Sequence, residues 1–169
     1  MDPISIATAS ASLVITCSKL MGYIYTIINK CQNVDSAVQV LSIEIDLLSR
    51  VLASISTSFN NPLLATAALR SQTGHEAQHW RDVRQSMDDC KSTLEDLERI
   101  LESIKKESGG FLWRPKKLIR LEMKSTEIQL LKQQVNAYRQ TLHLLLQLIN
   151  VYISPFIDFM FTMLTALPV

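Results

Sequence analysis

The charge-poor N-terminus is the feature that most constrains how this chain can fold. The first 31 residues of the 169-residue sequence carry only three charged side chains, Asp2, Lys19 and Lys30. Asp2 and Pro3 form a helix-start signal, because aspartate caps a helix and a proline in the first turn sacrifices no hydrogen bond. A helix that is apolar or small on nearly every side either packs inside a core or enters a bilayer. The function of the protein depends largely on which of these environments the helix occupies.

The composition favours a single globular domain made of helices. A chain of 169 residues is long enough to bury a core as one domain, and its four glycines and five prolines are few for a turn-rich β fold. The net charge of +1 argues against nucleic-acid binding. A secretory signal would require basic residues near the N-terminus, and none precedes Lys19. The three cysteines, Cys17, Cys31 and Cys90, form no close pair in the sequence. We therefore expect a cytoplasmic protein with reduced thiols.

Apolar residues at alternating three- and four-residue spacing predict three further long helices after a first helix over 4–31. The second helix is expected to end at Asn60-Asn61-Pro62, with a short helix over 63–69 after it. The third helix is expected to begin near His75, and the fourth near Pro115. The residues predicted to form the core seam are Leu41, Leu48, Trp80, Met87, Leu94, Leu101, Ile128, Val135 and Leu142.

These elements predict an all-α protein, an antiparallel bundle of four to five long helices over residues 1–150. One continuous coiled-coil rod is the rival arrangement, but Gly109-Gly110 and Asn60-Asn61-Pro62 would let the chain fold back. Residues 151–169 form a separate hydrophobic tail, and Asp158 is the only charge from position 144 to the end. Residues 144–167 are long enough for a membrane span, although Pro155 and Asp158 weaken that interpretation. The alternatives are packing along the bundle and a segment that lies on a surface.

One short motif raises the question of an enzyme. His75-Glu76-Ala77-Gln78-His79 matches the H-E-x-x-H pattern, which on a helix places two imidazoles on one face to hold zinc. The extended metalloprotease pattern fails, because Asp82 and Gln85 stand where glycine and histidine are needed. The sequence also lacks the G-x-S-x-G nucleophile motif. We therefore expect no enzymatic activity, no cofactor or metal, and no small-molecule substrate.

A second segment of interest follows the third predicted helix. Residues 105–124 carry seven basic and two acidic side chains, and aromatic residues lie beside the basic ones. Such a loop suits an anionic membrane surface, because rings enter the headgroup layer and basic groups meet lipid phosphates. The alternative is that the aromatic residues cap the end of the bundle. The residues of this predicted lipid-facing loop are Phe111, Leu112, Trp113, Arg114, Lys116 and Lys117.

The whole of residues 1–150 resembles the fungal N-terminal domains of the HeLo-like group. The resemblance is carried by the MDPIS start, VLASISTSFNNPLLATAAL (51–69) and SQTGHEAQHWRDVRQSMDDCKSTLEDLERILE (71–102). GGFLWRP (109–115) and LLKQQVNAYRQTL (130–142) complete it. Family members usually continue into an NTPase, a repeat array or an amyloid motif. This sequence contains no G-x-x-x-x-G-K-S/T nucleotide-binding loop, and its last segment does not look like the family.

The resemblance implies a helical bundle used in fungal non-self recognition and regulated cell death, with the N-terminal helix as the segment that attacks membranes. Residues 4–31 would extend roughly 42 Å as a helix, enough for a bilayer core. Lys19 would lie in mid-span, so insertion would need an oligomer that hides this charge or lines a pore with it. The residues expected to target the membrane are Ile4, Ile6, Leu13, Val14, Ile15, Leu20, Tyr23, Ile24 and Ile27.

A second function stays open from the sequence alone. The bundle would then be an interaction module that associates with itself or with a related HeLo-like domain of a receptor, and its first helix would never leave the core. Under the membrane-attack hypothesis, an anionic plasma membrane is a further partner of the protein.

Overall fold

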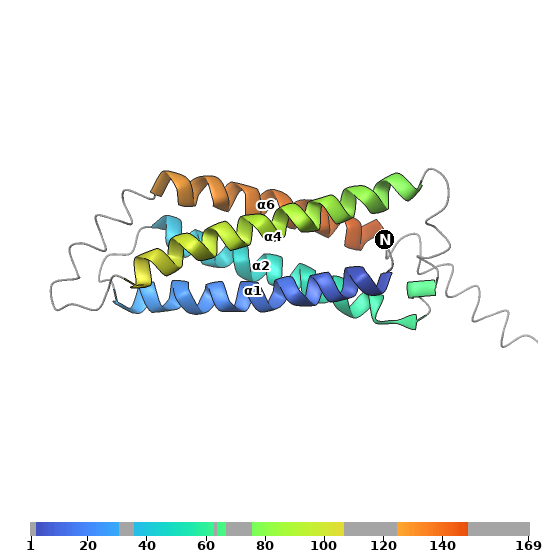
Figure 1. The fold of residues 1–169 in the computed structure, drawn as a ribbon, viewed down its shortest axis with the longest axis horizontal. Coiled ribbons are helices and arrows are strands. Elements are labelled where there is room, and N and C mark those ends of the chain that lie inside the picture. Colours follow the sequence, from blue (N-terminus) through green and yellow to red (C-terminus); the bar gives the residue numbers. More distant parts are fainter. Residues whose placement is uncertain (1–2, 31–35, 63, 67–75, 107–124, 149–169) are drawn as a thin grey trace, which may run out of the picture.

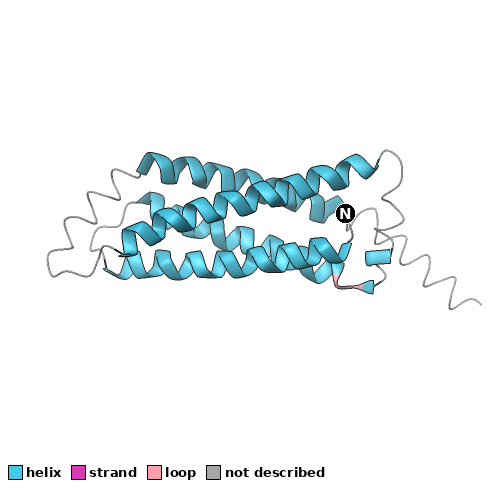
Figure 2. Ribbon diagram, viewed as in Figure 1, coloured by secondary structure: helices cyan, strands magenta, loops and turns pink. Residues whose placement is uncertain are grey.

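Four long helices lie side by side in a computed structural model of the chain (Figure 1). The structure describes residues 3–30, 36–62, 64–66, 76–106 and 125–148. The long helices are α1 (Pro3–Lys30), α2 (Ser36–Phe59), α4 (Glu76–Lys106) and α6 (Ser125–Leu148). Across these ranges the structure contains no strand, as Figure 2 shows. The prediction of an all-α helical bundle is confirmed, and the alternative of one continuous rod is wrong because the chain folds back on itself.

The helices are arranged as a four-cornered bundle. α1 packs beside α2 and α4, and α6 packs beside the same two helices, so α1 lies opposite α6 and α2 lies opposite α4. Successive helices run in opposite directions along the bundle (Figure 1). Because α2 and α4 occupy opposite corners, the chain between them must cross the end of the bundle. This crossing makes α1 parallel to its neighbour α4, an arrangement that the predicted antiparallel packing did not include.

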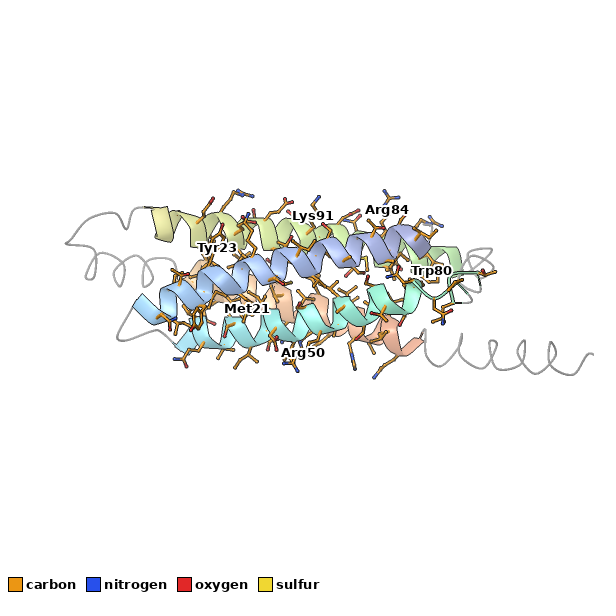
Figure 3. The ribbon with its side chains drawn as sticks, turned by 90° about the horizontal axis from the view of Figure 1, so that it is seen from below. Met21, Tyr23, Arg50, Trp80, Arg84 and Lys91 are labelled. Atoms are coloured by element: carbon orange, nitrogen blue, oxygen red, sulfur yellow. The ribbon has the colours of Figure 1, made fainter. Side chains whose placement is uncertain are left out.

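Helices α1 and α2 have the most extensive contact in the bundle. α2 places a half-buried serine at every seventh position, at Ser42, Ser49 and Ser56. Such small side chains let a neighbouring helix approach closely. α1 carries Val14 and Met21 at the same spacing, and both pack against the core; Figure 3 shows Met21 on the side of α1 toward α2. The two helices therefore form a tight hairpin.

The core is one continuous cluster with contributions from all four helices. At one end Phe59 and Trp80 meet edge to face, with ring centroids 5.9 Å apart. Farther along, Thr93 Oγ1 on α4 donates a hydrogen bond to the Tyr138 hydroxyl on α6 at 3.4 Å. Every residue of the predicted core seam is buried, and the most exposed of them is Trp80 at 8%. Burying each large aliphatic side chain stabilises the fold by about 1.5–3 kcal/mol.

The helix boundaries agree with the sequence pattern where the structure describes them. α2 ends at Phe59, and the backbone N–H of Asn60 donates to the Ser56 carbonyl at 3.1 Å. Residues 64–66 are helical, and Ala65 donates to the Asn61 carbonyl at 2.9 Å. The predicted start of the last helix at Pro115 lies outside the described residues, as do the rest of 107–124 and the tail over 149–169.

Candidate functional site

The N-terminal helix α1 has one face in the core and one face in solvent. Ile6, Leu13, Leu20, Ile24 and Ile27, all expected to target the membrane, are buried in the bundle at 3% exposure or less. The resting position of α1 is therefore that of a core helix. A membrane role for these side chains requires α1 to leave the bundle.

The outward face of α1 carries the remaining large apolar side chains. Ile4 and Ile15, two more of the predicted residues, are 64% and 72% exposed, while Val14 and Tyr23 are half-buried. Tyr25 is 67% exposed and was missed by the sequence analysis. Counting outward positions from Ile4 at alternating four- and three-residue steps would have found it.

Four hydroxyl groups of α1 are satisfied within the helix itself. Each of several Ser and Thr side chains donates to the carbonyl four residues earlier, at distances of 2.8–3.3 Å. This back-bonding lets hydroxyls lie in apolar surroundings without an unmet donor. These four hydroxyls therefore need no water molecule to accept their proton. The residues with this contact are Thr8, Thr16, Ser18 and Thr26.

Lys19 is the only charged residue between Ile4 and Asn29. Its Nζ pairs with Glu98 Oε1 on α4 and lies 6.0 Å from the centre of the Tyr23 ring. The hydrogen bond to Glu98 raises the pKa of Lys19 above its usual value. The single charge that would oppose membrane entry is thus partnered across the α1–α4 contact.

Helix α4 has the opposite kind of surface. Fourteen of its 31 residues are Asp, Glu, Lys or Arg, against two of the 28 residues of α1. Figure 3 shows Arg84 and Lys91 pointing outward from it. In the described part of the chain, every exposed large hydrophobic side chain lies on one of the other three long helices. These side chains are Ile4, Ile15, Tyr25, Val40, Ile43, Leu130 and Leu144.

Two free thiols lie inside the bundle, one on each of the parallel helices α1 and α4. Cys17 and Cys90 are both fully buried in the core cluster. Burial raises the pKa of each thiol to about 12, and the neighbouring Cys17 adds to the rise at Cys90. Neutral buried thiols are poor nucleophiles, so the structure gives these cysteines a packing role.

The remaining predicted sites are not brought together within the described residues. The aromatic and basic loop with Phe111, Trp113 and Lys116 falls outside them, as does His75. Glu76 and His79 belong to the first turn of α4, but their side chains are not described. Over the described ranges, no group of three or more His, Cys, Asp or Glu side chains could hold a metal ion.

Among the described helices, α1 is the one long and apolar enough to cross a membrane, over Ile4–Asn29 with a mean hydropathy of 1.5. Buried core helices of soluble proteins reach similar values, so this measure alone assigns no role. Comparison of the chain with known protein families, with curated proteins and with solved structures finds no match. Within the described residues, α1 and its outward face are the features that bear on a membrane role.

Proposed function

We propose that this protein is a non-enzymatic signalling bundle of the HeLo-like kind, in which α1 is a stored membrane-active helix. Oligomerisation releases α1 from the core, and the helix then enters and disrupts an anionic membrane. Under this proposal the protein is cytoplasmic at rest and is recruited to the plasma membrane during non-self recognition or regulated cell death. The support for the biological setting is the sequence resemblance.

The observation that carries the proposal is the small number of polar groups on α1 that need water. Four of its Ser and Thr hydroxyls bond to the helix's own carbonyls, and Lys19 is its only charge between Ile4 and Asn29. A helix of this kind loses few water contacts when it moves from the bundle surface into lipid. A surface like that of α4, with 14 charged residues, would make the same transfer prohibitively costly.

Release of α1 also has a cost that the membrane must offset. The five buried aliphatic side chains of α1, from Ile6 to Ile27, contribute on the order of 10 kcal/mol to its place in the bundle. Insertion into hydrocarbon removes the same side chains from water and recovers much of that free energy. Association of several released helices would hide Lys19 from lipid. The proposal therefore couples release, insertion and oligomerisation.

Dye release from vesicles tests the proposal directly. We expect the full-length protein to empty anionic vesicles under oligomerising conditions and to leave neutral vesicles largely intact. Ile15→Glu places a charge on the outward face of α1 and should reduce leakage at least about tenfold, because a carboxylate in hydrocarbon costs roughly 2.5–3.5 kcal/mol. Ser92→Glu, at an exposed position of α4, is the matched control and should leak like the wild type.

Both substitutions are at exposed positions, so each should change the free energy of unfolding by no more than about 0.5 kcal/mol. Thermal melting followed by circular dichroism checks that expectation. Equal leakage from the two variants, or intact vesicles with the wild type under every oligomerising condition, would overturn the proposal.

A second candidate function rests on exposed apolar side chains that lie away from α1. Val40 and Ile43 on α2, with Leu130 and Leu144 on α6, are 40–60% exposed. Release of α1 gives these residues no role, whereas an interaction module that pairs with a second copy or with a related domain would cover them. Size-exclusion chromatography with light scattering distinguishes the two functions. A discrete dimer that is indifferent to anionic vesicles would favour the interaction module.

A further inference from the structure

Lys19 is the residue through which α1 makes an ion pair with α4. It is exposed to 53% and sits near the middle of α1, next to the exposed Ile15 turn. Because no other charged residue lies between Ile4 and Asn29, the electrostatic link between this stretch of α1 and the bundle depends on Lys19.

The partner of Lys19 is better buried than Lys19 itself. Glu98 on α4 pairs with the Lys19 ammonium group and is only 20% exposed. Tyr23, one turn farther along α1, places its ring centre 6.0 Å from the ammonium nitrogen, and Figure 3 shows it on the side of α1 toward α4. Glu102, one turn beyond Glu98, adds a weaker attraction. The positive charge is therefore held at the α1–α4 seam by groups from both helices.

We infer that the Lys19–Glu98 ion pair is an electrostatic latch, which holds α1 against α4 and opens when lipid phosphates replace Glu98 as the partner of Lys19. If α1 leaves the bundle in water, Lys19 and Glu98 lose each other as partners and neither gains a new one. At an anionic membrane the phosphates offer Lys19 a new partner, while Glu98 becomes free to be solvated. In a zwitterionic membrane each phosphate is already paired with the cation of its own headgroup, so the exchange is much weaker. This inference rests on the proposed release of α1 and adds the lipid charge that triggers it.

A second ion pair in the bundle provides a matched control. Arg139 Nε on α6 lies 3.1 Å from Glu44 Oε2 on α2, and the two side chains are 26% and 18% exposed. This pair also joins two parallel neighbouring helices, but neither of them is α1. Removing it weakens the bundle without touching the contact between α1 and α4.

The holding role of the latch is testable without lipid. Cys90 lies in the core on α4, so a water-soluble thiol reagent modifies it only when the bundle opens. Glu98→Gln should speed this modification about two- to fivefold, the range expected for one partly exposed ion pair. Glu44→Gln should change the rate of Cys90 modification only by the amount that its change in overall stability, measured by thermal melting, accounts for. Equal acceleration in the two variants, after correction for stability, would overturn the latch.

The lipid exchange is tested with vesicles of increasing phosphatidylserine content. In the wild type, the rate of Cys90 modification should rise above its lipid-free value only beyond a threshold phosphatidylserine content. Glu98→Gln should lower that threshold. The double variant Lys19→Glu with Glu98→Lys keeps an ion pair in the bundle but gives α1 a charge that phosphate repels. It should therefore stay closed at phosphatidylserine contents that open the wild type.

The two experiments separate the latch from the proposed function. A double variant that responds to phosphatidylserine as the wild type does would overturn the exchange of partners. Faster modification of Cys90 in Glu98→Gln without lipid would support the holding role of the ion pair. If vesicles nevertheless never leaked, the membrane-disrupting function would be contradicted while the holding role stood.

Discussion

Helices α1 and α4 are parallel neighbours in the bundle, and they differ mainly in what they show to solvent. Each has a regular apolar face in the same core cluster, with fully buried residues such as Leu20 on α1 and Leu94 on α4. Outward, α1 is nearly uncharged and α4 carries most of the charge of the four long helices. The buried faces account for the fold, and the outward faces separate a helix that could enter lipid from one that could not.

The charged residues of α4 differ in where their partners lie. Several of its charges pair along the helix at i,i+3 or i,i+4 spacing, including Lys91 with Glu95 and Arg99 with Asp96. Such exposed pairs contribute little to stability. Glu98 differs because its partner, Lys19, lies on another helix. Under the proposed function, α4 is the fixed support and α1 is the element whose attachment changes.

The largest expected effect tests whether the two helices are equal members of the core. Leu20→Ala and Leu94→Ala each leave a cavity at a fully buried position, and each should cost about 2–5 kcal/mol in free energy of unfolding. Urea denaturation measures both values. A near-zero cost for Leu20→Ala beside a large cost for Leu94→Ala would show that α1 does not belong to the stable core.

Alkaline pH should weaken the seam between the two helices. Burial raises the pKa of Cys17 and Cys90 from 9.0 to about 12, so the folded state retains protons that the unfolded state loses. The free energy of unfolding should therefore fall as the pH rises from about 9 to about 12. The raised pKa of Lys19 acts in the same direction, because its ion pair is lost when the ammonium group deprotonates.

Urea denaturation at several pH values between 8 and 11 measures this alkaline loss. The double variant Cys17→Ala with Cys90→Ala should be less stable at neutral pH, because it removes buried sulfur, but its stability should decline less steeply with pH. An unchanged slope would show that the thiols are not buried as described.

The buried hydroxyls of the two helices should respond in opposite directions. Ser10 on α1 is fully buried and its Oγ has no hydrogen-bond partner, whereas Thr93 on α4 donates to Tyr138. Ser10→Ala should stabilise the bundle by about 1 kcal/mol, and Thr93→Val should destabilise it by a similar amount. Thermal melting compares them. A loss of stability in Ser10→Ala would mean that the hydroxyl has a partner.

The smallest expected change in stability is at Gly22, on the outward face of α1. A Cβ at Gly22 would meet no atom within 4 Å, so Gly22→Ala should add helix propensity without a clash. It should stabilise the bundle by about 0.5–1 kcal/mol, and the comparable Ser92→Ala on α4 by no more than about 0.5 kcal/mol. Chemical denaturation resolves the difference. Destabilisation by Gly22→Ala would indicate that this face is already covered by another surface.

The fold was largely predictable from the sequence because apolar spacing reports directly on burial. The stripe that includes Leu41 and Leu48 on α2, and Met87 and Leu94 on α4, identified the buried faces correctly. The corner positions were not predictable, because spacing within a helix does not say which neighbour it meets. The crossing between α2 and α4, which makes α1 parallel to α4, is therefore a finding of the structure.

The candidate site was only partly predictable. Low charge identified α1, but it could not separate Ile6, which is buried, from Ile15, which is exposed. The partner of Lys19 was not predictable either, because Glu98 is distant in sequence and α4 offers several similar carboxylates. Contacts between helices depend on rotation and offset, and a sequence pattern fixes neither.

The most direct test of the account follows Cys17 and Cys90 separately. Both thiols are buried in the resting bundle, one on the helix proposed to leave and one on the helix that stays. The measurement is modification by a water-soluble maleimide, read for each cysteine by peptide mass spectrometry, with and without anionic vesicles. We predict that both thiols react only slowly without vesicles, and that with vesicles Cys90 reacts much faster while Cys17 stays protected in lipid. Protection of both thiols on vesicles that have bound the protein and leaked, or equal reactivity of both, would contradict it.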